Sequence, residues 1–122
     1  YIYTENLFIL NDNTDMVSQE KIKKIISYIH KNYQNNITLK DISNIVYMSP
    51  NYLCSFFKKY TGLSFKEYLN HYRCEKAAKL ILNTDLKILD IALLCGFDNI
   101  SYFIRKFKSI YGCTPKIYRN LI

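Results

Sequence analysis

Two short stretches of the sequence carry side chains that could bind a DNA duplex. An amide such as that of Asn51 can pair with N6 and N7 of adenine, and a guanidinium such as that of Arg105 with O6 and N7 of guanine. Lysines can neutralise phosphates, and serines can bond either bases or phosphates. The candidate DNA-binding residues are Pro50, Asn51, Cys54, Ser55 and Lys58 in the first stretch and Ile100, Ser101, Ile104, Arg105 and Lys108 in the second.

Some of these assignments have a structural alternative. Ile100 and Ile104 would suit contacts with thymine methyl groups, but one of them could simply pack under a neighbouring loop. Lys58 and Lys108 favour phosphate contacts, although a surface lysine can also be a solvated charge. The second stretch has the stronger base readers, so we expect it to carry more of the direct readout, or the first stretch to read DNA shape.

Both stretches belong to an internal repeat with a spacing of fifty residues. Two copies are too few for a solenoid, and they indicate two related subdomains that do the same work at two places. The identical pairs are Tyr52/Tyr102, Phe57/Phe107, Lys58/Lys108, Gly62/Gly112, Lys66/Lys116, Tyr68/Tyr118 and Asn70/Asn120.

The pattern of apolar residues and capping signals predicts an all-α fold. Ser49-Pro50 and Thr114-Pro115 are typical helix starts, and Gly62 and Gly112 are typical helix ends. Each repeat then reads as a short helix, a tight turn and a longer helix, which is the helix-turn-helix arrangement. Helices are expected at about 18–34, 38–47, 50–61, 65–82, 88–95, 100–111 and 115–121.

The net charge of +7 is unevenly distributed along the 122 residues. Residues 1–36 hold four lysines and four acidic residues, whereas residues 37–122 hold thirteen basic and six acidic residues. A basic domain points toward nucleic acid or an anionic membrane surface. We do not expect a membrane partner, because no apolar run approaches the ~20 residues that cross a bilayer and the apolar stripes are consumed by the core.

The cysteines favour neither a metal site nor a catalytic site. Cys54, Cys74, Cys95 and Cys113 contain no CxxC pair, so free thiols in a reducing compartment are expected. A thiol nucleophile would need a nearby histidine, and His71 precedes Cys74 by three residues, yet nothing else assembles a pocket. We therefore expect no enzyme, metal or cofactor. The alternative to DNA binding is a protein-interaction module that uses the same helix pairs.

The second repeat resembles the C-terminal signature of the AraC/XylS family of transcription regulators. The matching stretch is IALLCGFDNISYFIRKFKSIYGCTPKIYR, and the upstream stretch MSPNYLCSFFKKYTGLSFKEYLNHYRCEKAAKLIL is similar to the first unit and linker helix of that family. The resemblance covers about residues 18–121. Departures from the family pattern are Ser43 in place of alanine, Lys87 in place of a Ser/Thr cap, and Cys113 in place of an aliphatic residue.

The resemblance implies a bacterial transcription regulator, an activator that contacts RNA polymerase, located in the cytoplasm with the nucleoid. It implies seven helices and a structural role for Arg73 in the linker helix. A helix of this length would hold two recognition helices about 34 Å apart, so that one monomer enters two successive major-groove segments.

The resemblance and the composition together predict the domain organisation. Residues 1–16 are expected to be a linker or the remnant of an N-terminal domain for effector binding or dimerisation. Residues 17–122 are expected to form the DNA-binding domain. Its predicted parts are a first helix-turn-helix subdomain at 17–63, the linker helix at 64–83 and a second helix-turn-helix subdomain at 84–122.

Overall fold

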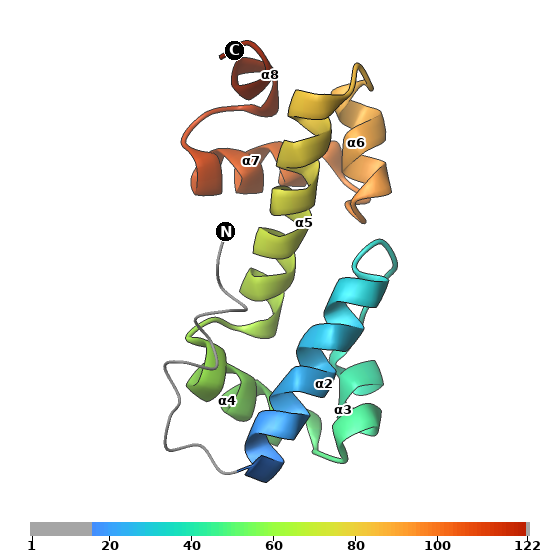
Figure 1. The fold of residues 1–122 in the computed structure, drawn as a ribbon, viewed down its shortest axis with the longest axis vertical. Helices are drawn as coiled ribbons and strands as arrows, with labels where there is room; N and C mark the ends of the chain where they lie inside the picture. The colour runs from blue at the N-terminus through green and yellow to red at the C-terminus, as the bar shows by residue number, and fades with distance from the viewer. Residues whose placement is uncertain (1–15, 122) are drawn as a thin grey trace. The chain divides into compact units, whose positions relative to one another are not determined.

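The computed structural model describes residues 16–121, and over that range it is built from helices without strands. Figure 1 shows the elements, and they confirm the predicted all-α fold with seven helices. Of the segment predicted as linker or remnant, only Met16 falls within the described residues, and it begins the first of these helices. The helices are α2 (Met16–Asn32), α3 (Leu39–Val46), α4 (Pro50–Thr61), α5 (Phe65–Asn83), α6 (Ile88–Leu94), α7 (Ile100–Tyr111) and α8 (Pro115–Arg119).

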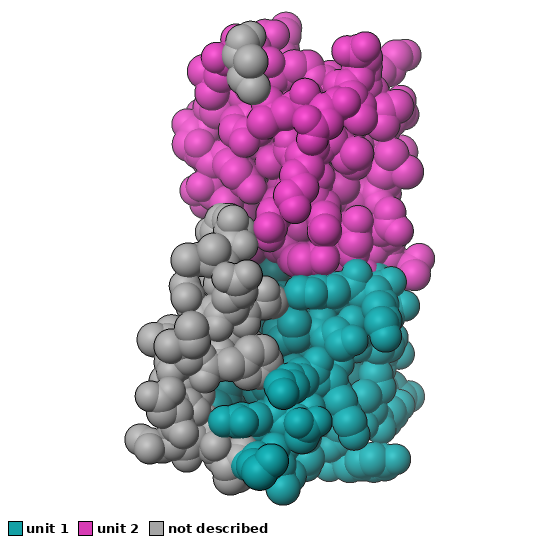
Figure 2. Space-filling model, viewed as in Figure 1, with its two compact units in different colours: residues 1–32, 37–68 teal, residues 33–36, 69–122 magenta. Residues whose placement is uncertain are grey.

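The chain divides into two compact units, coloured separately in Figure 2. Unit 1 takes in the described residues up to Asn32 together with Ile37–Tyr68. Unit 2 takes in Tyr33–Asn36 together with the residues from Leu69 onward. The first turn of α5 thus belongs to unit 1 and the remainder of that helix to unit 2, while the subdomain boundaries drawn from the sequence stay a prediction.

Unit 1 is built around aliphatic and aromatic side chains from three helices. Helix α2 packs on α3, and α3 packs on α4. The isoleucines of α2 recur at helical spacing, which explains why one stripe of this helix is buried. Phe57 meets the ring of Tyr68 edge-on, with centroids 5.6 Å apart. The buried apolar residues of these three helices are Ile22, Ile25, Ile26, Ile29, Ile42, Val46, Leu53, Phe56 and Phe57, and Ile37 and Tyr68 are buried beside them.

Unit 2 has a core of small and aromatic side chains. Ala77, Ala78 and Ala92 are small enough to let α5 and α6 approach closely, and Phe103 and Phe107 fill the space beneath α7. Helix α8 is tied to the end of α5 because the Arg119 guanidinium donates from Nε to the carbonyl of Ile81 (3.0 Å) and from Nη2 to that of Thr84 (3.1 Å).

Equivalent caps begin and end α4 and α7. The side chains of Ser49 and Asn99 accept hydrogen bonds from the backbone N–H groups of Tyr52 and Tyr102, at 3.2 and 3.0 Å. Gly62 and Gly112 end the helices with φ of +80° and +82°, in the left-handed region where glycine is least strained. These caps fix where each helix starts and stops, and so which of its residues face outward.

The repeat spacing changes from 49 to 50 inside the turn. The N-cap of α3 is Thr38 and that of α6 is Lys87, a difference of 87 − 38 = 49. The N-cap of α4 is Ser49 and that of α7 is Asn99, a difference of 99 − 49 = 50. The segment from the first N-cap to the second is therefore one residue longer in unit 2 than in unit 1. Lys87, which stands in place of a Ser/Thr cap, makes no side-chain capping bond, so the start of α6 lacks the hydrogen bond that begins α3.

Candidate nucleic-acid interface

The five candidate residues of α4 all lie on its exposed face. The opposite face of the helix is spent on the core through Leu53, Phe56 and Phe57. The positions between them turn outward, as a 3.6-residue period requires. The exposed candidates are Pro50, Asn51, Cys54, Ser55 and Lys58. An amide, a hydroxyl and an ammonium group thus share one accessible surface of α4.

Helix α7 exposes three of its five candidates, namely Ser101, Arg105 and Lys108. Ile100 and Ile104 are only half-exposed, and both pack against the core of unit 2. They sit one turn apart on the edge of the stripe formed by Phe103 and Phe107, which explains their partial burial. The structure thus places both isoleucines in the packing role that the sequence left open for one of them.

Arg105 lies over an aromatic ring on its own helix. Its guanidinium carbon is 5.6 Å from the centroid of the Tyr102 ring. The Tyr102 hydroxyl accepts a hydrogen bond of 2.9 Å from Nδ2 of Asn70, a buried residue of α5. The ring is held at one end by this bond, so it can restrict the directions in which the arginine extends.

Sequence reasoning missed the supporting roles of Tyr102 and Asn70. Lys106, also not among the candidates, places its ammonium 5.4 Å from the same ring. The signal that could have found Tyr102 was its position three residues before Arg105, since residues at that spacing are neighbours on a helix. The partnership with Asn70 joins residues 32 apart in sequence and carried no local signal.

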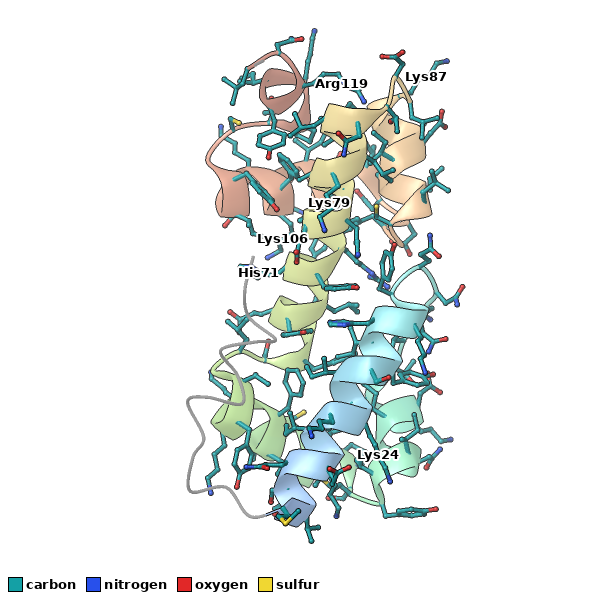
Figure 3. All side chains as sticks on the ribbon, in the orientation of Figure 1. Lys24, His71, Lys79, Lys87, Lys106 and Arg119 are labelled. Atoms are coloured by element: carbon teal, nitrogen blue, oxygen red, sulfur yellow. The ribbon has the colours of Figure 1, made fainter. Side chains whose placement is uncertain are left out.

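Helix α2 carries a net positive charge that is not apparent from the charge count over residues 1–36. It carries Lys21, Lys23, Lys24 and Lys31 against one acidic residue, Glu20, which pairs with Lys23 at 3.8 Å. Lys24, labelled in Figure 3, is exposed. The acids that balanced these lysines in the count over residues 1–36 lie, apart from Glu20, outside the described residues.

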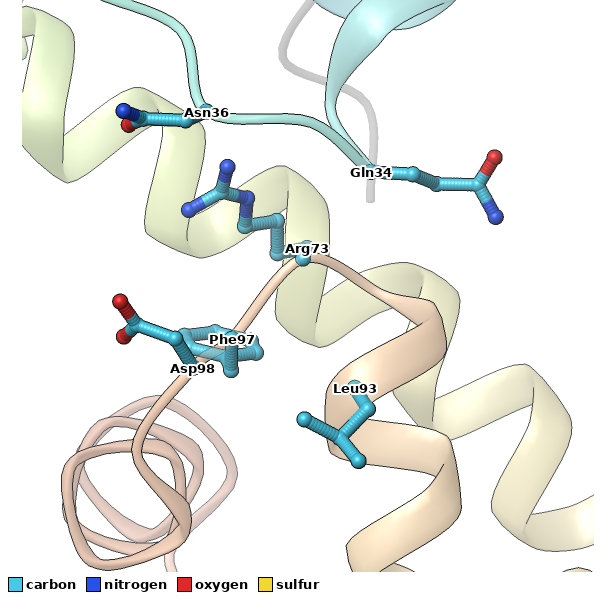
Figure 4. Close-up of a pocket in the computed structure, with 7 residues that line it drawn as sticks. Gln34, Asn36, Arg73, Leu93, Phe97 and Asp98 are labelled. Atoms are coloured by element: carbon cyan, nitrogen blue, oxygen red, sulfur yellow. The ribbon is translucent and has the colours of Figure 1, made fainter.

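Arg73 lines a hollow of about 460 Å³ in unit 2. Figure 4 shows its side chain reaching from α5 toward Asn36. Its Nε donates to the carbonyl of Tyr33 (2.7 Å) and its Nη2 to that of Asn35 (2.8 Å). These bonds tie the segment after α2 to α5, and burial lowers the pKa of the guanidinium. The hollow is lined by Gln34, Asn36, Arg73, Leu93, Gly96, Phe97 and Asp98.

The four cysteines are free thiols, and two of them are buried and unreactive. Burial raises the pKa of Cys74 to about 12 and that of Cys95 to about 11, which suppresses the reactive thiolate. Cys54 is exposed and Cys113 is half-exposed. In the described part of the chain, no cluster of His, Cys, Asp and Glu side chains could hold a metal ion.

None of the helices within residues 16–121 is long and apolar enough to span a membrane.

Known proteins match both the sequence and the fold. A family model described as a helix-turn-helix domain matches residues 42–121. The regulatory protein PocR of Salmonella typhimurium is 37% identical over 102 residues, which cover 84% of this chain and 34% of PocR. The chain thus spans about a third of the length of that relative.

Solved structures agree with these sequence matches. The C-terminal domain of the two-component response regulator yesN from Fusobacterium nucleatum is 42% identical with a TM-score of 0.73, over 83% of this chain and 96% of that one. A regulator from Chromobacterium violaceum, described as having an AraC-type DNA-binding domain, is 27% identical with a TM-score of 0.77, over 87% and 95%. This chain belongs to the AraC/XylS family of helix-turn-helix transcription regulators and contains the DNA-binding domain of that family.

Proposed function

We propose that this domain recognises a specific double-stranded DNA sequence through the exposed faces of α4 and α7, each in the major groove. The observation that carries the proposal is the outward face of α7. Ser101, Arg105 and Lys108 are exposed there, opposite two fully buried phenylalanines. A guanidinium that stacks on a tethered tyrosine suits bidentate readout of guanine.

Helix α4 supplies the second reading face in the proposal. Asn51 and Ser55 can reach base edges or phosphates, and Lys58 stands where α7 has Lys108. We infer that the two lysines hold phosphates in their respective halves of the site. The two helices would then read two successive major-groove segments, with half-sites about 10 bp apart.

The regulatory part of the proposal concerns a larger protein. This chain spans only 34% of PocR, so an additional domain for effector binding or dimerisation would lie outside the present sequence. We propose that the full protein activates transcription through contact with RNA polymerase. Promoter fusions with and without the full-length gene test this directly: loss of expression on deletion supports activation, and a gain indicates repression.

Selection of bound duplexes from a random pool, followed by footprinting, tests the DNA readout. Two enriched blocks separated by about 10 bp support two reading helices in one monomer. One short block contradicts the two-helix proposal and leaves α7 as the expected reader.

The competing function is a protein-interaction module, and salt dependence distinguishes it from DNA binding. DNA affinity should fall steeply with salt, with a slope of about −0.9 per phosphate contact on a log–log plot. Failure to enrich any duplex at moderate salt would favour the protein module.

A further inference from the structure

Helix α6 exposes leucines on its outward face. Leu89 and Leu93 are 51% and 55% exposed, and Leu86 and Leu94 are exposed as well. Leu89 and Leu93 lie one turn apart on the same side of the helix. Single exposed leucines are common on proteins, but a group of four within nine residues is the kind of patch that marks an interaction site. We name these four residues the α6 leucine surface.

The equivalent helix of unit 1 is polar at two of these four positions. With the spacing of 49 that relates α3 to α6, Leu89 corresponds to Lys40 and Leu93 to Asn44, both exposed. Leu86 and Leu94 correspond to Ile37 and Ile45, which are apolar in both units. The shared backbone therefore does not require leucine at positions 89 and 93, and these two residues are the centre of the surface.

The charges near this surface are opposite in sign to those of the rest of the domain. Asp85, Asp90 and Asp98 are exposed there with one lysine, Lys87, which gives 1 − 3 = −2 over residues 85–98. Residues 16–121 together hold 17 basic and seven acidic side chains, a balance of 17 − 7 = +10. Carboxylates repel phosphates, so the α6 leucine surface does not suit DNA.

Helices α6 and α7 contact each other, but the four leucines are not among the side chains packed against the core that these helices share. In Figure 1, α6 lies on one side of α5 and the length of α7 extends on the other. Leu93 also lines the hollow beside Arg73, whose rim carries Asp98. A partner on α6 would thus find an apolar strip beside a hollow that is lined by both the Arg73 guanidinium and the Asp98 carboxylate.

We propose that the α6 leucine surface binds an amphipathic helix of another protein, one whose apolar ridge is flanked by lysine or arginine. Leucines suit the ridge, with anchors at positions i, i+3, i+4 and i+7, and the aspartates suit the basic flanks. The proposal is independent of how α4 and α7 read DNA, because it rests on the opposite charge and on the other side of α5.

A second copy of this chain is a poorer occupant. A two-fold symmetric contact would bring the acidic flanks of two copies together, which is unfavourable. Four partly exposed leucines also supply much less than the ~800 Å² per partner found in stable complexes. The contact therefore fits a weak, regulated association with a basic helix rather than a permanent dimer.

A peptide titration followed by two-dimensional NMR tests the proposal. The probe is a helical peptide of about 18 residues with leucines at i, i+3, i+4 and i+7 and lysines on both flanks. The matched control has glutamate in place of each lysine. We expect amide shifts concentrated in residues 86–94 with the lysine peptide and much weaker shifts with the glutamate peptide. Equal binding of the two peptides, or shifts centred on another element, would overturn the proposal.

The double variant Leu89→Lys/Leu93→Asn gives α6 the side chains that α3 carries at the same positions. We expect it to fold, because both leucines are exposed. We also expect its affinity for the lysine peptide to be lower by about tenfold or more, since a few anchoring side chains supply most of the binding energy in such contacts. Should the double variant misfold, Leu93→Asn alone gives the same comparison. Unchanged peptide affinity in a folded variant contradicts the proposal.

Two further measurements separate the other occupants. Sedimentation of the unmodified domain across a concentration series should show a monomer, and a dimer abolished by Leu89→Lys/Leu93→Asn would assign the surface to a second copy instead. Affinity for a selected duplex should be the same for the variant and the parent. A loss of DNA affinity in the variant would place α6 in the DNA contact and overturn the proposal.

Discussion

The left-handed residue that follows the first helix of each helix-turn-helix differs between the two units. In unit 1 it is Tyr47, at a φ of 57°, and its side chain is 90% exposed. In unit 2 it is Gly96, at a φ of 97°, and a Cβ added there would lie 2.3 Å from the carbonyl oxygen of Tyr33 and 2.7 Å from Nε of Arg73. Both units need a left-handed residue at this point, but only unit 2 packs backbone and an arginine against it.

The exposed faces of the recognition helices differ in a similar way. Ser55 of α4 corresponds to Arg105 of α7, and Asn51 corresponds to Ser101. The caps and buried rings that set the two helices are equivalent, so the repeat holds the backbone while the outward chemistry diverges. The residue type at equivalent positions of the two units is therefore set by the neighbouring side chains, although the backbone conformation is shared.

Truncating the equivalent core phenylalanines should produce the largest effects. Phe107→Ala and Phe57→Ala should each lower the free energy of unfolding by about 3–5 kcal/mol. Phe107→Ala should cost more, because its ring meets Phe103, Tyr111 and Tyr118 at centroid distances of 5.7, 4.6 and 5.3 Å, whereas Phe57 meets Phe65 and Tyr68 at 6.3 and 5.6 Å. Urea unfolding measures both, and a larger loss for Phe57→Ala would reverse the ranking.

The left-handed residues Gly96 and Tyr47 should differ in how strongly a substitution changes stability. Gly96→Ala should lower the free energy of unfolding by about 2–4 kcal/mol, because left-handed strain adds to the loss of the Arg73–Tyr33 hydrogen bond. Tyr47→Gly should change it by less than about 1 kcal/mol, because relief of strain offsets the entropy of a more flexible unfolded chain. Thermal unfolding of the pair is the measurement. Equal effects would show that the Tyr33 carbonyl and the Arg73 side chain can move to accommodate a Cβ at position 96.

Arg105→Ala and Ser55→Ala sharpen the comparison of the reading faces. Arg105→Ala should cost about 1–3 kcal/mol on the selected duplex and relax the preference at one base pair. Ser55→Ala should cost less than about 1.5 kcal/mol, the range of a single neutral hydrogen bond. Lys79→Ala, which removes one exposed positive charge of α5, is the control for net charge. An equal loss of affinity for all DNA sequences would indicate that Arg105 contacts a phosphate and not a base.

Lys58→Ala and Lys108→Ala should give the smallest and most similar effects. Each should weaken binding to every duplex alike and reduce the log–log salt slope by about 0.9, the contribution of one phosphate contact. Affinities measured across a salt series give both slopes. A slope that changes in one variant alone would mean that the shared position has a different task in the two units.

Much of the fold could be predicted from the sequence because its signals are local. Capping residues, stop glycines and stripes of isoleucine or phenylalanine each act within one or two turns of helix, and they placed the helix ends to within two residues, the largest differences being in α2 (predicted 18–34) and α8 (predicted 115–121). The outward positions of α4 follow from the same period. In contrast, the bonds from Arg73 to the 33–36 segment and from Asn70 to Tyr102 join distant residues, and no local pattern encodes them.

The candidate site could be predicted only where the helical period determines whether a side chain is buried or exposed. Phase cannot say how much a residue at the edge of the buried stripe packs, so Ile100 and Ile104 looked available and are half-buried. The α6 leucines were invisible to the same reasoning, because an apolar residue on a short helix reads as core. For Leu89 and Leu93, the exposed Lys40 and Asn44 at the aligned positions of α3 show that the fold does not require a leucine there.

The half-buried isoleucines of α7 bear on how the domain can evolve. A mutation at Ile100 or Ile104 alters both the recognition surface and the core beneath it, so selection for folding narrows what is allowed there. All five candidate positions of α4 are exposed and escape that restriction. Under the proposed readout, the half of the operator assigned to α4 should therefore change faster among descendants of this protein than the half assigned to α7.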